Sequence, residues 1–349
     1  MTAGARYLRR GPRYRPAFNG TAAAAGAPVF AALDLGTNNC RLLVARPAAD
    51  GFRVIDAFSR IVRLGEGVGA SGCLSEAAIE RTLDALRVCA RKMRLRGVTH
   101  GRSVATEACR QAGNCTGFLD RVRHETGIKL EIISTHEEAQ LALAGCRPLL
   151  DGSEPHALVF DIGGGSTELI WLTLSPGGPV EIHDTLSIPC GVVCFAERYG
   201  GDVIDAQVYE AMVADVAARL ASFEAANGIR DKIASGLVQM LGTSGTVTTI
   251  AGVHKQLPRY DRALVDGCHL TFDEIAAANR QLVGLDYRGR AALACIGPDR
   301  ADLVVAGSAI LEAICRTWPV GRLRVADRGL REGILLNLMR DAALAGVAG

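Results

Sequence analysis

Hydrophobic and polar residues form a repeated pattern along this chain, in which a short apolar run stops at an acid and resumes after a small polar loop. Residues 157–160 are apolar, Asp161 ends the run, glycines occupy positions 163–165, and residues 169–174 are apolar again. Two apolar runs around a short polar loop are typical of a β-hairpin. The pattern therefore predicts two paired strands with an acid beside their connecting loop.

A second segment of the chain repeats this arrangement. Residues 29–33 lead to Asp34, residues 35–39 form a polar loop, and residues 40–46 are largely apolar. Residues 34–37 match residues 161–164 in their order of acid, aliphatic residue and glycine. Self-similarity at domain-sized spacing predicts two related halves that face a shared cleft, although a coincidence of two turns is the alternative.

Helical patterns lie between the apolar strands. In residues 76–95, apolar positions recur every three or four residues, and Ser75 can cap the helix. Thr271 and Glu274 have the spacing of a capping box. Residues 300–318 and 329–344 are also expected to be helical. Alternating helices and strands predict α/β layers with mixed sheets.

The small-residue loops are candidate phosphate sites. Glycines let a backbone approach a ligand closely, and successive N–H groups in such a loop can converge on an anion. A third small-residue loop, residues 242–246, precedes a predicted helix, whose free N–H groups attract anions. Asp161 and Glu168 would repel a phosphate unless a divalent cation lay between them. Three glycines alone are more typical of a tight hairpin turn, so this reading depends on the other motifs.

Length and composition set the class of protein. The chain has 349 residues, 49% of them hydrophobic, with a mean hydropathy of +0.18. This length predicts two domains. No uninterrupted apolar segment of about 18 residues occurs, so we expect no membrane span. The net charge of +2 does not indicate a nucleic-acid partner.

The first 28 residues differ from the remainder in charge. They contain no acid and lack apolar periodicity, and their arginines are Arg6, Arg9, Arg10, Arg13 and Arg15. We predict a disordered basic tail over residues 1–28. An organelle transit peptide and a weak polyanion-binding arm are the alternatives.

The cysteines indicate a reducing compartment. Their number, eleven, is odd, and they have no framework spacing. Cys40, Cys89 and Cys315 lie in apolar or helical patterns and are expected to be small buried hydrophobes. Cys190 and Cys194 have no second Cys/His pair at metal spacing, which disfavours zinc. We therefore expect a cytoplasmic location.

Several motifs together resemble one known family. They are residues 34–41, 63–67, 105–114, 133–139, 161–168, 242–249 and 330–333. In this order they resemble the exopolyphosphatase/guanosine pentaphosphate phosphohydrolase (Ppx/GppA) family of the actin–Hsp70–sugar kinase superfamily, over nearly all of residues 29–339. Two departures are Thr37 and Asn39, where the family commonly has serine.

The resemblance implies roles for individual residues. From the residues alone, Glu138 would only complement a helix dipole; the resemblance makes it the glutamate that activates the attacking water. Asp161 and Glu168 are implied to lie near Mg²⁺, with Asp34 as a third candidate ligand. Phosphate contacts are implied for Thr37, Asn38, Arg41, Arg110, Gly163, Gly164, Gly165, Ser166, Thr167, Gly242, Ser244 and Gly245.

These inferences lead to one expectation for the whole chain. We expect two ribonuclease-H-like α/β domains with a cleft between them: residues 29–135, onto which a helix at residues 330–349 packs back, and residues 136–329. The expected activity is Mg²⁺-dependent release of orthophosphate from the ends of inorganic polyphosphate. Alternatives are removal of the 5′ γ-phosphate of guanosine pentaphosphate, or a sensor without turnover; a kinase is disfavoured. The resemblance also implies a homodimer.

Overall fold

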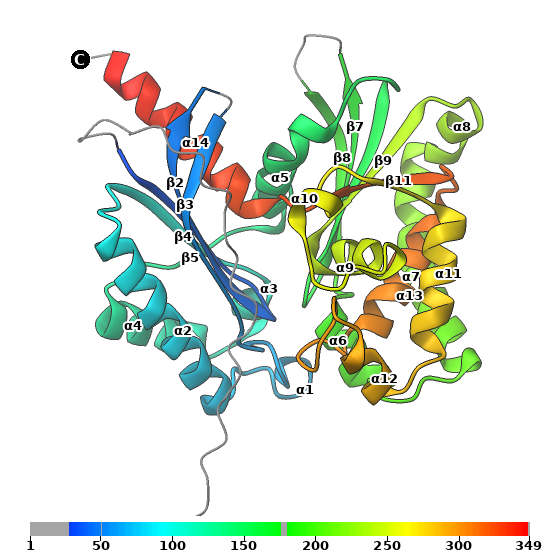
Figure 1. Cartoon of the computed structure of the whole chain (residues 1–349), viewed down its shortest axis with the longest axis horizontal. Helices are drawn as coiled ribbons and strands as arrows, with labels where there is room; N and C mark the ends of the chain where they lie inside the picture. Colours follow the sequence, from blue (N-terminus) through cyan, green and yellow to red (C-terminus); the bar gives the residue numbers. More distant parts are fainter. Residues whose placement is uncertain (1–27, 50, 176–179, 348–349) are drawn as a thin grey trace, which may run out of the picture.

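The computed structural model describes residues 28–49, 51–175 and 180–347. Figure 1 shows two α/β halves side by side, each built on one sheet with helices packed against it. Residues 1–27 of the expected basic tail lie outside the described residues. No described helix is both long enough and apolar enough to cross a membrane.

The first half contains one sheet and the helices that precede residue 130. Its strands are β1 (Phe30–Leu35), β2 (Asn39–Ala48), β3 (Gly51–Ile61), β4 (His100–Ala105) and β5 (Glu131–Ile132). Its helices are α1 (Val68–Ser71), α2 (Glu76–Leu95), α3 (Glu107–Gln111) and α4 (Cys115–Thr126). Ser75 caps α2 through a bond from the N–H of Ala78, as predicted.

Helix α5 (Thr135–Cys146) and the short 3-10 helix η1 (Arg147–Leu149) lead into the second half. Its strands are β6 (His156–Ile162), β7 (Thr167–Leu174), β8 (Val180–Ile188), β9 (Val238–Thr243), β10 (His269–Thr271) and β11 (Arg322–Ala326). Its helices are α6 (Val192–Tyr199), α7 (Ala206–Asn227), α8 (Ile229–Ala234), α9 (Ser244–His254), α10 (Arg262–Val265), α11 (Phe272–Val283), α12 (Tyr287–Ala292) and α13 (Val304–Thr317). The chain then continues into α14 (Leu330–Val347).

The two sheets repeat the same strand order. The first has the order β3-β2-β1-β4-β5, with β1 antiparallel to β2 and parallel to β4. In the second, β8-β7-β6-β9-β11 repeats this order, with β6 antiparallel to β7 and parallel to β9, while β10 adds an edge. The repeated topology confirms the predicted α/β fold with a ribonuclease-H-like sheet in each half.

Strand β1 is buried on both faces. Because side chains alternate along a strand, its residues pack into two different cores. Leu33 packs in a core with apolar residues of α2 and α4, whereas Phe30 packs with Ile334 and Leu335 of α14. Figure 1 shows α14, in red, lying along the blue strands of the first half. Full burial of each such side chain contributes about 1.5–3 kcal/mol, so α14 is part of the core of the first half.

Helices α5 and α14 cross with their backbones in direct contact. A Cβ atom on Gly333 would overlap the carbonyl oxygen of Leu141, and one on Gly145 would overlap the carbonyl oxygen of Gly329. Only glycine allows so close an approach. The crossing therefore fixes α14 against the helix whose first turn carries Glu138.

One local prediction was wrong in its bounds. Residues 300–318 were expected to be one helix, but α13 begins at Val304. The carbonyl of Ala301 instead accepts a bond from Arg290 Nε (2.9 Å), and Asp302 pairs with Arg63 in the other half. Helix α6 was not predicted. The cysteines are free, and Cys40, Cys89 and Cys315 are buried, as predicted.

Candidate active site

The predicted phosphate loops meet where the two sheets face each other. The β1–β2 turn of the first half and the β6–β7 turn of the second half are in contact. A Cβ atom on Gly164 would lie 3.0 Å from the backbone nitrogen of Asn38, and one on Gly165 would lie 2.6 Å from Thr37 Oγ1. The glycines at these positions therefore allow the two loops to approach, which a side chain would prevent.

The first loop contains polar atoms without partners. Thr37 and Asn38 are 5% and 7% exposed. Among the described residues, Thr37 Oγ1, Asn38 Oδ1 and Asn39 Oδ1 are buried and accept or donate no hydrogen bond. Buried polar groups are normally paired, so three unpaired atoms in consecutive residues are suited to contact a polar ligand.

The second loop is shaped by hydrogen bonds to its own hairpin and to α6. The N–H of Gly163 donates to the carbonyl of Ser166 (2.9 Å), and its carbonyl accepts from Val192 (3.0 Å). A Cβ atom on Gly191 would overlap Gly164. The start of α6 therefore lies directly on the glycine loop, and Gly191 is a site residue that sequence reasoning missed.

Two carboxylates, the half-buried Asp161 and the buried Glu168, lie at the base of the second hairpin. Asp161 and Glu168 are paired in register on β6 and β7. Burial raises the pKa of Asp161 to about 6, while Arg41 opposes this shift and Asp34 adds to it. Burial and then the charge of Asp161 raise the pKa of Glu168 to about 7. Carboxyl groups that are this hard to ionise together would be stabilised as anions by a cation.

Hydrogen bonds orient the Glu168 carboxylate. Its Oε1 accepts bonds from the hydroxyls of Ser166 (2.6 Å) and Ser187 (3.0 Å). Thr167 is turned away into the core, where its hydroxyl donates to the carbonyl of Cys190 (2.6 Å). Among residues 166–168, the side chains of Ser166 and Glu168 therefore bond to each other, whereas that of Thr167 bonds to neither.

These carboxylates fit a hard divalent cation. The described residues contain no group of three or more His, Cys, Asp or Glu side chains arranged to hold a metal ion. In phosphoryl-transfer sites, however, Mg²⁺ is usually held by one or two carboxylates, with waters and substrate phosphates completing its shell. Asp161 and Glu168 supply two such carboxylates. Asp34, the third candidate ligand, differs from them: burial raises its pKa, and the charges of two arginines, Arg41 and Arg331, oppose this shift.

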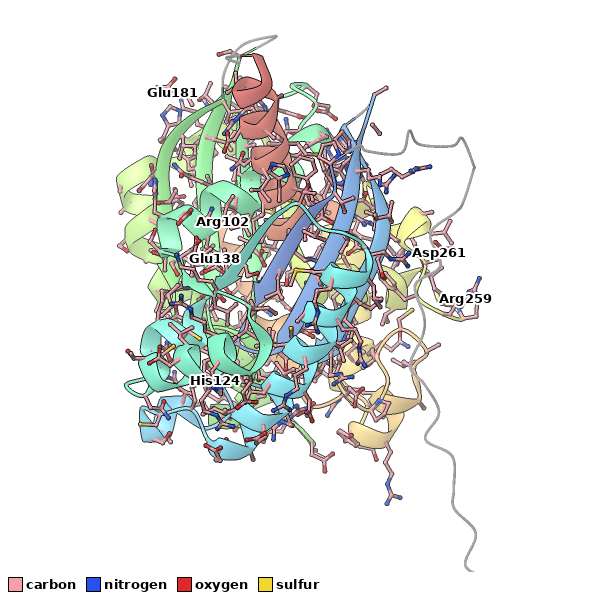
Figure 2. All side chains as sticks on the ribbon, turned by 90° about the vertical axis from the view of Figure 1, so that its left-hand side faces the viewer. Arg102, His124, Glu138, Glu181, Arg259 and Asp261 are labelled. Atoms are coloured by element: carbon pink, nitrogen blue, oxygen red, sulfur yellow. The ribbon has the colours of Figure 1, made fainter. Side chains whose placement is uncertain are left out.

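Glu138 lies beside these acids, in the first turn of α5. Figure 2 labels it at the start of this helix, which the hydroxyl of Ser134 caps. Arg110 Nη1 donates to Glu138 Oε2 (2.8 Å) and to the carbonyl of Ile133 (2.9 Å). Burial raises the pKa of Glu138 well above its ordinary value, with Glu168 adding to the shift and Arg110 opposing it.

Arg110 is more constrained than the sequence suggested. Its Nε donates to Glu107 Oε2 (2.8 Å) in addition to its contacts with Glu138 and Ile133. Although burial acts against the charge, Glu138 raises the pKa of Arg110. The guanidinium therefore orients Glu138 in this structure, and its contact with phosphate stays a prediction.

One narrow pocket joins the three predicted loops. Its lining includes Asn38, Asn39, Arg41, Gly163, Gly164, Ser244, Gly245, Thr246 and Arg300. Among the described residues, neither Arg41 nor Arg300 forms an ion pair with a carboxylate. Two such arginines at one pocket provide positive charge for an anion. Arg300 was missed because its segment was predicted to be helical; the Gly-Pro-Asp-Arg sequence that ends at this residue was the available turn signal.

The third loop is shorter than predicted because β9 runs directly into α9. Ser244 makes the turn with φ = 86°, a left-handed conformation that is uncommon for residues other than glycine, and its hydroxyl donates to the carbonyl of Ile162 (2.7 Å). Strained residues of this kind cluster at functional sites. Gly242, in contrast, lies within β9 against the ring of Phe160 and is not among the residues that line the pocket.

Comparison with known proteins agrees with this geometry. The Ppx/GppA phosphatase family profile matches residues 43–342. Exopolyphosphatase 2 of Mycobacterium tuberculosis is 29% identical over 321 residues, covering 88% of this chain and 98% of that protein. The guanosine-5′-triphosphate,3′-diphosphate pyrophosphatase of Aeromonas salmonicida is 29% identical over 317 residues, covering 89% of this chain and 60% of that protein.

A solved structure shares the arrangement of both halves. The crystal structure of an exopolyphosphatase-like protein superposes with a TM-score of 0.81 and 28% sequence identity, covering 90% of this chain and 98% of the other. The family profile begins within β2 and ends within α14, so it includes the second hairpin but neither β1 nor the first loop. The chain belongs to the Ppx/GppA phosphatase family.

Proposed function

We propose that this protein hydrolyses the terminal phosphoanhydride bond of inorganic polyphosphate and releases orthophosphate. The observation that carries the proposal is Glu138, a half-buried carboxylate held by Arg110 (2.8 Å) beside the acids of the second hairpin. A binding protein for polyphosphate has no need of a base there. The M. tuberculosis relative is named an exopolyphosphatase, which supports polyphosphate as the substrate.

The reaction is displacement at the terminal phosphorus by water. Arg41 and Arg300 would hold the phosphoryl oxygens, and the backbone of the glycine loop would bind the next phosphate. The Glu138 carboxylate takes a proton from the water as its oxygen bonds to phosphorus. The bond to the bridging oxygen breaks, and the shortened chain leaves with that oxygen.

Asp161 and Glu168 would hold Mg²⁺, which neutralises the charge on the phosphoryl oxygens when it is bound. Because burial raises the pKa of Glu138, the base is ionised only at higher pH than an exposed glutamate. Activity should therefore rise with pH through the raised pKa of Glu138. The positive charge of Arg110 lowers the pKa of Glu138 and so limits how far this rise in activity is shifted to higher pH.

Guanosine pentaphosphate is the second candidate substrate. Its 5′ terminus also ends in a phosphoanhydride bond, and the A. salmonicida relative is named for this same nucleotide, guanosine 5′-triphosphate 3′-diphosphate. Both substrates would use the same loops and the same base. The two are distinguished by measuring phosphate release from each, at matched concentrations of terminal phosphate.

The decisive test replaces Glu138 and its neighbour in turn. Glu138→Gln should lower kcat for phosphate release by about 10²–10⁴-fold, because the base is lost while the shape is kept. Glu137→Gln is the matched control. Glu137 lies in the same turn, but its Oε1 accepts a bond from Arg102 Nη2 (2.7 Å) instead of from Arg110. Full activity of Glu138→Gln would refute the mechanism.

A sensor without turnover gives a different result. Wild-type protein that binds but does not cleave either substrate would favour that alternative and overturn the proposed activity. The homodimer implied by the family resemblance also stays a prediction. Light scattering of the purified protein would test it.

A further inference from the structure

The turn at residues 63–67 carries a motif that the proposed function does not use. Arg63 follows β3 and has φ = 47°, a left-handed conformation that a side chain makes unfavourable. Figure 1 shows the segment near α1 reaching from the first half towards α6 and α12 of the second. A strained arginine at the boundary of two halves raises the question of what it holds.

The side chain of Arg63 forms a bidentate ion pair across that boundary. Its Nη1 donates to Asp302 Oδ2 (2.7 Å) and its Nη2 to Asp302 Oδ1 (2.9 Å). Nη2 also donates to the carbonyl of Asp299 (3.3 Å). Bidentate arginine–carboxylate pairs fix orientation as well as charge. The hydrogen bonds to Asp302 accordingly raise the pKa of Arg63.

The backbone of the same turn is bonded to the first phosphate loop. The N–H groups of Val62 and Arg63 donate to the carbonyl of Asn38 (2.9 and 3.0 Å), and Gly65 donates to that of Thr37 (2.9 Å). Gly65 itself has no room for a Cβ against Thr37. Any movement of the turn is therefore transmitted to the loop that bears the unpaired polar atoms.

The other end of the ion pair belongs to the segment that carries Arg300. Residues 299–302 are held in the second half by Arg290, whose buried guanidinium donates to the carbonyl of Ala301 (2.9 Å). Gly201 packs against Asp302, since a Cβ there would lie 2.7 Å from the Asp302 carbonyl. Arg300 thus moves with the second half, and Arg63 connects it to the first.

We propose that Arg63 is a positioning residue, which latches the two halves together and so holds Arg300 opposite Asn38 and Arg41 in one pocket. The inference rests on the proposed function, because it concerns the pocket in which that reaction takes place. A second bond crosses the boundary beside it, from the N–H of Gly67 to Glu197 Oε1 (2.8 Å). Opening the latch would separate the cations that one phosphate terminus must contact together.

The latch acts on the population of closed molecules. If binding requires the closed arrangement, the apparent dissociation constant rises as the closed fraction falls. The Arg63 and Asp302 side chains are 31% and 27% exposed, so solvent weakens the pair. Its loss should therefore weaken binding about 3–10-fold, while bound substrate still reaches the same base.

The test compares two carboxylates that each accept a bidentate arginine. Asp302→Asn removes the pair between the halves, whereas Glu210→Gln removes the Arg316–Glu210 pair (2.6 and 2.8 Å) within the second half. Asp302→Asn should raise KM about 3–10-fold with kcat nearly unchanged, and Glu210→Gln should change neither. A lower melting temperature with unchanged KM would overturn the proposal, because it indicates a merely structural role.

A double-variant experiment tests whether the two residues act through one contact. Arg63→Gln and Asp302→Asn should each raise KM, and the double variant should be no worse than the poorer single variant. Effects that multiply would overturn the latch. Arg63→Lys keeps the charge but cannot span both oxygens, so its KM should be intermediate.

A binding measurement separates this inference from the proposed activity. Inorganic triphosphate, titrated into the protein in EDTA, reports affinity without turnover. Weaker binding by Asp302→Asn, together with a larger radius of gyration in solution scattering, would support the latch even if the wild type cleaves nothing. Equal affinity and equal radius would overturn it, whatever the activity of the wild type.

Discussion

The two hairpins at the cleft have the same fold but opposite charge at the same register position. In the first, Asp34 on β1 is paired with Arg41 on β2. In the second, Asp161 on β6 is paired with Glu168 on β7. One hairpin thus has a carboxylate beside a cation, and the other has two adjacent carboxylates. The repeated backbone supplies two sites of different chemistry to one cleft.

The loops of the two hairpins also differ in the chemical groups that they present. The first presents polar side chains, with unpaired atoms in Thr37, Asn38 and Asn39, whereas the second is built from three glycines and presents backbone. The difference assigns anion contacts to the first hairpin and to the glycine loop, and cation contacts to the acids below that loop. Four changes within the two hairpins test this division.

The largest effect is expected from the acidic pair. Glu168→Gln removes one of two carboxylates proposed to hold Mg²⁺, so kcat should fall about 10²–10³-fold, since metal assistance is worth several kcal/mol. Steady-state phosphate release at rising Mg²⁺ measures it. Glu181→Gln, at an exposed position on the neighbouring strand (Figure 2), is the control. Unchanged Mg²⁺ dependence would remove Glu168 from the metal site.

The corresponding position in the first hairpin should affect binding more than catalysis. Arg41→Gln removes a cation from the pocket, and a charged hydrogen bond is worth about 1.5–3 kcal/mol, so KM should rise about 10–100-fold. Arg46→Gln, further along β2, is the control because Arg46 is absent from the pocket lining. A fall in kcat with constant KM would contradict the division.

One glycine from each of the two loops provides a smaller effect. A Cβ on Gly164 would lie 3.0–3.1 Å from atoms of Thr37 and Asn38, whereas one on Gly36 would meet nothing closer than 3.7 Å. Gly164→Ala should force the loops apart and raise KM about 3–10-fold. Gly36→Ala should be close to neutral. Equal effects in kinetic assays would show that loop contact does not matter.

The smallest effect is on stability. Because the pKa values of Asp161 (about 6) and Glu168 (about 7) are raised in the folded protein, it binds more protons than the unfolded chain between their ordinary and raised values. Without metal, stability therefore falls as pH rises through this range and stays low above it. Asp161→Asn should raise Tm by about 2–4 °C at about pH 8.

The stabilisation that Mg²⁺ gives the wild type should also depend on pH, but in the opposite direction. Thermal melts at about pH 5.5 and about pH 8, in EDTA and in Mg²⁺, should show a larger stabilisation at the higher pH, where the carboxylates are ionised. An equal shift at both values would mean that these acids do not bind the ion. The control is Glu181→Gln, which should melt as the wild type does.

Local patterns in the sequence predicted the hairpins and caps but not the distant contacts of the site. Apolar runs that end at Asp34 and Asp161 specified both hairpins, because strand pairing there is local. Arg300 was assigned to a helix although a Gly-Pro turn signal precedes it. The pairing of the neighbouring Asp302 with Arg63, far away in the chain, has no signal in this segment. Gly191 was missed for the same reason: its need for glycine comes from Gly164.

The burial of Arg110 was also beyond prediction. Its sequence position suggested an arginine free to reach an oxyanion, but Glu107 and Glu138 both bind it. Glu107 is close to Arg110 in the sequence, whereas Glu138 lies further along the chain, on α5. Patterns give the elements and the candidate groups, whereas partners depend on how separate elements pack.

The packing of α14 has a consequence for the order in which this protein can fold. One face of the first sheet, with Phe30 and Leu43, is covered by Ile334 and Leu335. Chains emerge from the ribosome N-terminus first, so this face is made long before the residues that cover it. A fragment of residues 29–135 should therefore expose this apolar face to solvent and aggregate. Early synthesis of this protein is the stage at which binding by a chaperone would matter most.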